Sequence, residues 1–195
     1  MIGVASIVLG VAVGLLRGGR FGGLAQIRLK SLWLVFVSLG LQLLIFPTAW
    51  WAEPPIGIAT GPLHVFTYAL IAVFVLLNFR TVWPVIPGAL LNLIVITANR
   101  GFMPASLDAL RTSGRETAVM RILEAPDNTL ANVVMMSDTT RLNVLGDILA
   151  VPSWVPMAVS FSIGDAAIML GIAWVIQSSM VRSAGTNSRS GTGKL

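Results

Sequence analysis

The side chains with the greatest chemical potential in this chain are a few carboxylates, amides and one arginine. The candidate binding residues are Asn92, Asn99, Arg141, Asp147 and Asp165. Two carboxylates beside an arginine and an asparagine are groups that bind a charged headgroup or exchange protons with a substrate. Their spacing matches no hydrolase, P-loop or metalloprotease motif. The sequence therefore indicates a polar site and leaves open whether the protein is an enzyme, a transporter or a scaffold.

Metal and thiol chemistry have little support. The chain has no cysteine, which excludes disulfides, thiol catalysis and thiolate ligands. With one histidine, His64, a zinc site would need most of its ligands from carboxylates, which is unusual. The Met135–Met136 pair could suggest copper, but methionines more often fill a core. We expect no metal and no cofactor, and we expect His64 and Tyr68 to be interfacial residues with wet polar tips.

Several candidates have a purely structural explanation as well. Asn92 would form a hydrogen bond between helices. Asp165 would cap a helix at the positive end of its dipole. Arg141 would form an ion pair with Asp138 or Asp147 that orders a loop. The sequence does not decide between these explanations and a binding site.

The elements that must position these groups are hydrophobic helices. The chain has 195 residues, of which 55% are hydrophobic and 11% are charged, and its mean hydropathy is +0.85. A soluble domain carries about 25% charged residues, so this chain lacks the polar surface of a soluble monomer. Its apolar residues also fall in long blocks. The composition predicts an all-α, polytopic membrane helix bundle of about five transmembrane helices.

The apolar blocks predict where the spans begin and end. The predicted spans cover residues 2–18, 31–46, 62–79, 82–98 and 163–181. Residues 1–181 then form one membrane domain. The tail over 182–195 is rich in Ser, Gly and Thr, and we expect it to be disordered. Pro84 and Pro87 fall in the first turns of the fourth span, where a missing N–H costs little.

One polar stretch, residues 99–152, interrupts the apolar pattern and predicts a long extracytoplasmic loop with short helices. Ser106 has the position of a cap for a helix that ends near Gly114. Glu116 to Glu124 has an amphipathic pattern.

The end of this loop brings two carboxylates toward each other. Ser162–Asp165 has capping-box spacing, so the last span begins there. The apolar, proline-containing segment from Val151 to Phe161 must run along the interface or dip into it and return. Either path can bring the two ends of this segment together. We therefore expect Asp147 and Asp165 to lie close together, with Arg141 within reach of at least one.

The basic residues predict the orientation in the membrane. In the five-span arrangement, one side of the membrane has no acidic residue. Eight of the thirteen basic residues fall on that side: Arg17, Arg20, Arg28, Lys30, Arg80, Arg182, Arg189 and Lys194. Because basic loops stay in the cytoplasm, this predicts an external N-terminus and a cytoplasmic C-terminus. Without the first span, the other four would keep the same orientation. The basic residues form no stripe of the kind that a nucleic-acid groove needs. The expected partners are therefore the bilayer and anionic lipid headgroups.

Several motifs resemble those of an uncharacterised bacterial multi-pass membrane family, a domain of unknown function. The resembling residues are Arg17–Arg20 with Leu24, Leu29 and Trp33; Leu91–Asn92 and Asn99–Pro104; Thr140–Leu142 with Leu145–Asp147; and Phe161–Asp165. The family pattern has glycine at the position of Arg100, which weakens any special role for this arginine. The resemblance implies a protein of the bacterial cytoplasmic (inner) membrane and brings no activity or catalytic residue.

Three functions compete. The first is handling of an amphiphile or small solute at the outer leaflet, by binding, transport or processing. The second is a non-catalytic accessory or scaffold subunit, with a membrane protein partner or a second copy of the chain. Its support is the small size of the chain, the lack of a catalytic signature, and the pair Gly10 and Gly14. The spacing of this pair permits close helix approach but is as readily explained by a glycine-rich helix. A channel has the least support, because no span carries a stripe of polar residues.

Overall fold

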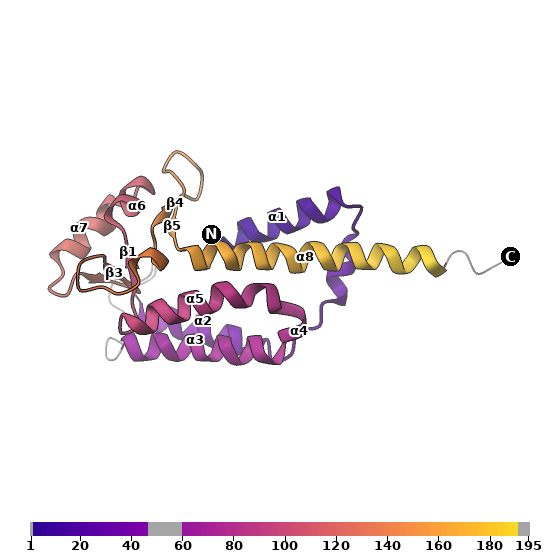
Figure 1. Cartoon of the computed structure of the whole chain (residues 1–195), viewed down its shortest axis with the longest axis horizontal. Helices are drawn as coiled ribbons and strands as arrows, with labels where there is room; N and C mark the ends of the chain where they lie inside the picture. Colours follow the sequence, from indigo (N-terminus) through magenta and orange to yellow (C-terminus); the bar gives the residue numbers. More distant parts are fainter. Residues whose placement is uncertain (1, 47–59, 191–195) are drawn as a thin grey trace.

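The computed structural model of the chain describes residues 2–46 and 60–190 (Figure 1). It is mostly helical, and each predicted span coincides with an apolar helix. These helices are α1 (Ile2–Leu16), α2 (Trp33–Ile45), α3 (Thr60–Leu77), α5 (Ile86–Ala98) with the short α4 (Phe79–Val82) before it, and α8 (Ile163–Ser190). Pro87 stands in the first turn of α5, as the sequence predicts.

The helices differ in length, and this bears on how many of them cross a membrane. The stretches Phe79–Ala98 and Ile163–Arg182 are long and apolar enough to do so. Three others are apolar but shorter: Gly3–Leu16, Trp33–Ile45 and Gly61–Leu77. By length and composition the described residues therefore hold two candidate spans and not the predicted five, because a helix of 13 residues, such as α2, rises only about 20 Å.

Helix α8 is the central element, with α1 on one side and α5, α3 and α2 on the other (Figure 1). Gly10 and Gly14 of α1 lie against α8. A Cβ on Gly10 would stand 2.8 Å from the Cβ of Ile176, and one on Gly14 would stand 2.7 Å from the Sδ of Met180. The glycine pair therefore lets two helices of the same chain pack closely.

The end of α8 differs from the prediction. The helix continues to Ser190, beyond the predicted end of the last span at residue 181. The first part of the expected disordered tail is therefore helical, and residues 191–195 lie outside the described range. Extending an existing helix adds one backbone hydrogen bond per residue without a new nucleation cost. The composition of the tail does not show this advantage.

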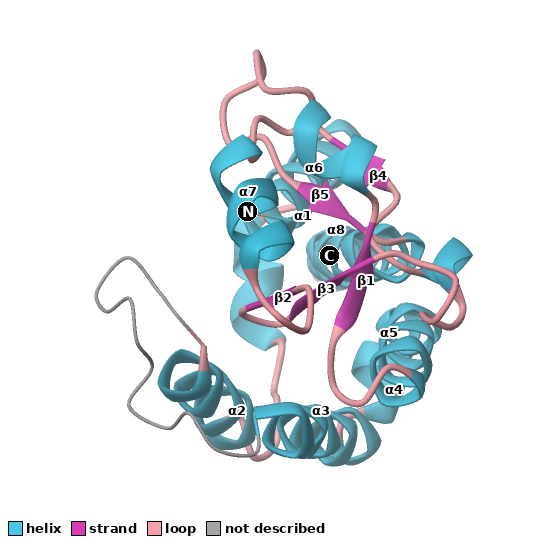
Figure 2. Ribbon diagram, turned by 90° about the vertical axis from the view of Figure 1, so that its left-hand side faces the viewer, coloured by secondary structure: helices cyan, strands magenta, loops and turns pink. Residues whose placement is uncertain are grey.

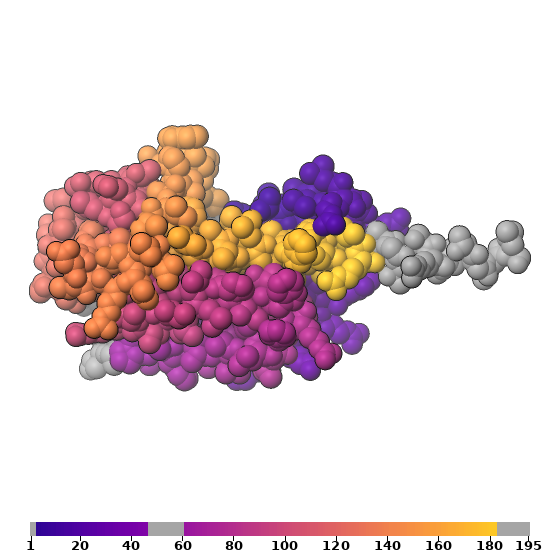
Figure 3. Space-filling view, in the orientation of Figure 1, coloured from indigo at the N-terminus to yellow at the C-terminus, as the bar shows by residue number. Residues whose placement is uncertain are grey.

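Residues 99–161 form a cap at one end of the helices, as the space-filling view shows (Figure 3). The cap contains a three-stranded sheet in the order β1 (Met103–Ala105), β3 (Val133–Met135), β2 (Thr129–Leu130). Strands β1 and β3 are parallel, and β2 is antiparallel to β3. The all-α prediction is therefore wrong for the cap, because strands of two or three residues are too short to show an alternating pattern.

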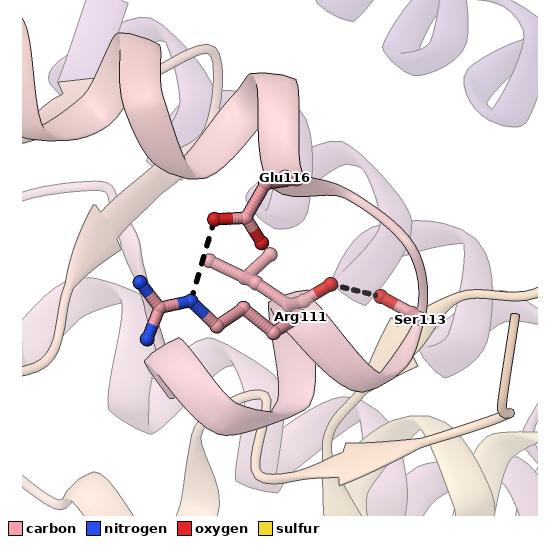
Figure 4. A network of polar contacts seen from close by, with 4 residues as sticks. Arg111, Ser113 and Glu116 are labelled. Atoms are coloured by element: carbon pink, nitrogen blue, oxygen red, sulfur yellow. Dashed lines mark hydrogen bonds and ion pairs between the residues drawn. The ribbon is translucent and has the colours of Figure 1, made fainter.

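Two short helices cover this sheet and confirm the predicted helices of the loop (Figure 2). Helix α6 (Leu107–Thr112) is capped by Ser106, whose Oγ accepts a hydrogen bond from the N–H of Ala109. Helix α7 (Glu116–Glu124) follows. It is amphipathic, and its apolar face is buried against α6 and the sheet. An ion pair of 3.4 Å between Arg111 and Glu116 joins the two helices (Figure 4). Since both side chains are more than half exposed, this pair contributes little to stability.

The cap is tied to the helices through His64 of α3. Its side chain is only 1% exposed and stands between the rings of Phe46 and Tyr68. Its Nδ1–H donates a hydrogen bond to the carbonyl oxygen of Gly101. The expectation of a wet polar tip is therefore wrong for His64, because the loop after α5 supplies a partner that lets the ring be buried.

The segment between Asp147 and Asp165 folds as a hairpin. Strand β4 (Leu149–Ala150) pairs antiparallel with β5 (Ser160–Phe161), with Leu149 opposite Phe161. The apolar residues between the strands project beyond this pair, and Trp154 is 82% exposed. The chain thus leaves and returns to the same place, which is the geometry that brings the two carboxylates together.

Candidate functional site

The five candidate residues lie where α5 and α8 meet the cap, and they form two groups. Asn92, Asp147 and Asp165 lie where α8 begins. Asn99 and Arg141 lie at the end of α5. The single polar site expected from the sequence is therefore two neighbouring ones with different partners.

The first group is built on the start of α8. Ser162 precedes the helix, and its Oγ accepts a hydrogen bond of 2.9 Å from the N–H of Asp165. In return, the N–H of Ser162 donates to Oδ2 of Asp165 at 3.2 Å. These two bonds form the predicted capping box, with aspartate in the position usually held by Glu or Gln.

Asn92 of α5 closes this network from the neighbouring helix. Its Nδ2 donates to Oδ1 of Asp165 at 2.7 Å, and its Oδ1 accepts from the hydroxyl of Ser162 at 2.9 Å. Both ends of the buried amide are therefore paired, and both carboxylate oxygens of Asp165 accept a hydrogen bond. This arrangement matches the structural explanation for Asn92, a hydrogen bond between helices.

Glycines make the close contact between these helices possible. A Cβ on Gly164 would stand 2.0 Å from Oδ1 of Asn92, which no side chain can tolerate. A Cβ on Gly88 would stand 2.4 Å from the carbonyl oxygen of Gly164. The Asn92 amide thus reaches the capping box because neither α5 nor α8 has a side chain at the point where the two helices are closest.

Asp147 approaches the same place from the cap. Its N–H donates to the carbonyl of Pro104, and its carbonyl accepts from the N–H of Ser106, which fixes its backbone beside β1. Burial, and then the negative charge of Asp165, raise the pKa of the Asp147 carboxyl to about 7, while Arg115 acts in the opposite direction. Asp147 and Asp165 are therefore close enough to repel each other, as expected from the sequence.

The expected arginine is not the one that acts on this pair. Within residues 2–46 and 60–190, Arg141 forms no ion pair with Asp138, Asp147 or Asp165. The cation that acts on Asp147 is Arg115, at the start of α7. No local signal points to Arg115, because its position depends on how α6 and α7 fold back over the sheet.

The second group joins the end of α5 to the loop before Asp147. Asn99 is the C-cap residue of α5. Its Oδ1 accepts from the N–H of Arg141, and its Nδ2 donates to the carbonyl oxygen of the same residue, both at 2.8 Å. The Nδ2 also donates to the carbonyl of Val95, within the last turn of the helix. Asn99 therefore positions Arg141 through its backbone and leaves the guanidinium free to extend.

Beside the hydrogen bonds between Asn99 and Arg141 lies an open pocket of about 620 Å³. Its lining residues are Thr97, Ala98, Asn99, Arg100, Phe102, Asp127, Thr129, Val134, Thr139, Thr140 and Arg141. We call this hollow the arginine pocket. Arg100 and Arg141 are both exposed, and neither forms an ion pair with any residue that the structure describes. The lining carboxylate, Asp127, already accepts two hydrogen bonds from Thr129.

Arg100, to which the sequence assigns no special role, lines this pocket as well. It lies in the left-handed region with φ of 57°, ahead of Gly101 with φ of 98°. An L-residue is disfavoured there, and glycine suits the position better. The arginine places a second positive charge in the pocket at the expense of backbone strain. In the sequence, the signal for Arg100 is that an arginine stands where the resembling family has glycine.

The chemistry open to the two groups differs. Asp147 has a pKa suited to proton exchange near neutral pH. However, it is not among the residues that line the arginine pocket. The pocket itself offers two guanidinium groups, which are donors for phosphate or carboxylate oxygens. The amide hydrogens of Asn99 and the hydroxyls of Thr129 and Thr140 already donate to other residues of the chain. Among the described residues no group of three or more histidine or carboxylate side chains is placed to hold a metal ion.

Comparison with known proteins gives one match. The model of a family described as a family of unknown function (DUF5317) matches residues 26–177. No curated protein and no solved structure matches the chain. The matched range includes every resembling motif noted above except Arg17–Arg20 and Leu24, and it contains all five candidate residues.

Proposed function

The chain belongs to the family of unknown function DUF5317, and we propose that it is a multi-pass protein of the bacterial cytoplasmic membrane that binds an anionic amphiphile at the outer leaflet. In this proposal the five apolar helices cross or enter the bilayer, and the cap faces the outside. The arginine pocket receives the headgroup of the ligand.

The distribution of charge along the fold supports this orientation. The described acidic residues belong to the cap or to the adjoining start of α8: Asp108, Glu116, Glu124, Asp127, Asp138, Asp147 and Asp165. The far ends of the helices carry basic residues: Arg17, Arg20, Arg28, Lys30, Arg80 and Arg182. The cap also carries five arginines, so the asymmetry is that the far ends hold basic residues and, among the described residues, no acidic one. Because basic loops are retained in the cytoplasm, this asymmetry favours an external cap.

One observation carries the binding proposal: two arginines without ionic partners line a pocket at the end of an apolar helix. Thr97 belongs to the last turn of α5, so the pocket begins where the helix stops being apolar. In a membrane this level is the headgroup region, where arginines bind phosphate oxygens through paired N–H groups. Asn99 supports the site by holding the backbone of Arg141.

One of the sequence arguments for the scaffold alternative, the glycine pair, has an explanation within the chain. Gly10 and Gly14 lie against Ile176 and Met180 of the same chain, so their spacing does not require a partner. Among the described residues, the exposed apolar side chains spread over several helices, as expected of surfaces that face lipid.

The lipids that purify with the protein test the proposal. We would extract the protein in a neutral detergent and identify bound lipids and metabolites by mass spectrometry. Wild type and the control Arg121→Gln, an exposed arginine on α7 outside the pocket, should both be enriched in anionic lipid relative to the membrane extract. Arg141→Gln should lose this enrichment. Equal lipid content in all three proteins would refute headgroup binding.

Topology reporters test the orientation separately. A reporter fused after Lys194 should be cytoplasmic, and one inserted near Asn128 in the cap should be external. A cytoplasmic signal from the Asn128 insertion would reverse the proposed orientation and place the arginine pocket at the inner leaflet.

A further inference from the structure

An apolar groove of about 280 Å³ lies between α3 and α5. Its walls include Ile71 and Leu76 of α3 and Ile86, Leu90 and Leu93 of α5. Tyr68 also lines it. Leu90 is 49% exposed and Leu76 is 71% exposed, so the groove is open along its length.

The groove and the arginine pocket share one stripe of α5. Positions 86, 90, 93 and 97 lie within a narrow sector of a helix that turns 100° per residue. Ile86, Leu90 and Leu93 line the groove, and Thr97 lines the arginine pocket. Gly88 and Asn92 lie on another face, which packs against α8. A ligand on the stripe would therefore pass from apolar walls to a cationic end within one helical turn.

The length of this stripe matches one leaflet. From Ile86 to Thr97 the helix rises about 16 Å, and the hydrocarbon core of a bilayer is about 30 Å thick. The stripe is thus about as long as half of the core, which is the depth that a single acyl chain occupies. A helix from a partner is about 10 Å across and would need much more space than this groove offers.

We propose that the groove between α3 and α5 holds an acyl chain of the same anionic amphiphile whose headgroup lies in the arginine pocket. The ligand is then a membrane lipid with a phosphate-bearing head, and a free phosphate compound is not the natural ligand. This inference rests on the proposed function, since it assigns the substrate class of the same site. It adds a separate role to residues of α5 that bear no charge.

A pair of matched variants separates the groove from the pocket. Leu90→Trp adds bulk inside the groove. Ile94→Trp adds the same bulk on the same helix, at a residue of similar exposure (51% against 49%) that does not line the groove. Ala89→Leu is a second, smaller filling of the groove, for use if tryptophan disturbs folding. Arg141→Gln tests the headgroup.

Two probes are needed for each variant: phosphatidylglycerol and glycerol phosphate. Native mass spectrometry in neutral detergent measures the retained lipid, and calorimetric titration measures the free headgroup compound. Wild type should bind the lipid more than about tenfold tighter than glycerol phosphate, since each buried methylene adds several-fold in affinity. Leu90→Trp should weaken lipid binding at least about fivefold and leave glycerol phosphate binding unchanged.

The outcomes distinguish the two proposals. The groove assignment is supported if Leu90→Trp or Ala89→Leu weakens lipid binding and Ile94→Trp does not. It is overturned if a folded Leu90→Trp or Ala89→Leu protein binds the lipid like wild type, or if wild type binds glycerol phosphate as tightly as the lipid. If Arg141→Gln changes neither probe, the headgroup site itself is wrong. In that case the proposed function fails together with this inference.

Discussion

The side-chain amide of Asn99 holds both backbone polar groups of Arg141, with two hydrogen bonds of 2.8 Å. The two residues are 42 positions apart in the sequence. A third bond, to the carbonyl of Val95, keeps the amide in the last turn of α5. One residue thus attaches the loop that carries Arg141 to the end of the helix and sets one wall of the arginine pocket.

Replacement of Asn99 should therefore affect both folding and binding. Asn99→Ala removes three hydrogen bonds and should lower the free energy of unfolding by about 1–3 kcal/mol. Retention of anionic lipid should fall as well, although no charge is lost. Thermal unfolding and lipid mass spectrometry measure the two effects. The control is Asn132→Ala, whose side chain has no hydrogen bond within the described part of the chain. Similar behaviour of the two variants would contradict the role of Asn99.

Asn92 should behave as a structural residue. Asn92→Leu leaves Asp165 without its partner on α5 and should destabilise the protein by about 0.6–2 kcal/mol. Combining it with Asp165→Asn in a double-mutant cycle should give a smaller loss than the sum of the single changes. Asn132→Leu again serves as control. Asn128 is unsuitable for this purpose, because its φ of 53° makes any leucine there strained. Strict additivity would show that Asn92 and Asp165 do not stabilise each other.

Asp147 should make stability depend on pH. Its pKa is raised from 3.8 to about 7 in the folded protein, so the folded state holds this proton more tightly than the unfolded state. Stability from this group is highest below about pH 4. It falls as pH rises toward 7 and changes little above that.

The variant Asp147→Asn should flatten this part of the pH profile. It should also raise Tm at pH 8 by at least about 2 °C, because the unfavourable buried charge is removed. Thermal unfolding from pH 4 to 8 measures both. Asp138→Asn, at an exposed residue of the cap, should keep the wild-type slope. A slope that survives in Asp147→Asn would assign the titration to another group.

Arg100 should trade stability for binding. Arg100→Gly relieves the left-handed backbone, which costs an L-residue about 1–2 kcal/mol, although the added freedom of glycine in the unfolded chain offsets part of this. We expect a net gain in stability of up to about 1 kcal/mol, together with weaker retention of anionic lipid. Arg100→Gln keeps the strain and should weaken lipid retention alone. A loss of stability in Arg100→Gly would mean that the arginine side chain makes contacts that outweigh its strain.

The local features of the fold could be predicted because their signals are local. Each apolar block coincides with a helix, and the capping box at Ser162–Asp165 starts α8 as expected. Ser106 and the amphipathic pattern of Glu116–Glu124 correctly predict the short helices of the cap. In each case hydropathy or the need to pair the first N–H groups of a helix acts within a few residues.

The small sheet and the buried histidine could not be predicted in this way. Strands β2 and β4 have only two residues each. Strand β1 pairs with β3, although α6 and α7 lie between them in the sequence. His64 is buried because the loop at Gly101 brings it a hydrogen-bond acceptor. Such pairings depend on segments that are distant in the sequence, and no local pattern encodes them.

The sequence by itself determined the order of the apolar helices, the gathering of the acidic residues at one end of them, and the approach of Asp147 to Asp165. These follow from hydropathy, charge and a segment that must return to its starting point. Only the tertiary structure decided the partners: Asn92 bonds with Asp165, 73 positions away, and Arg115 instead of Arg141 acts on Asp147. The physical reason is that a buried polar group must be paired, but any donor that packing brings within reach can satisfy it.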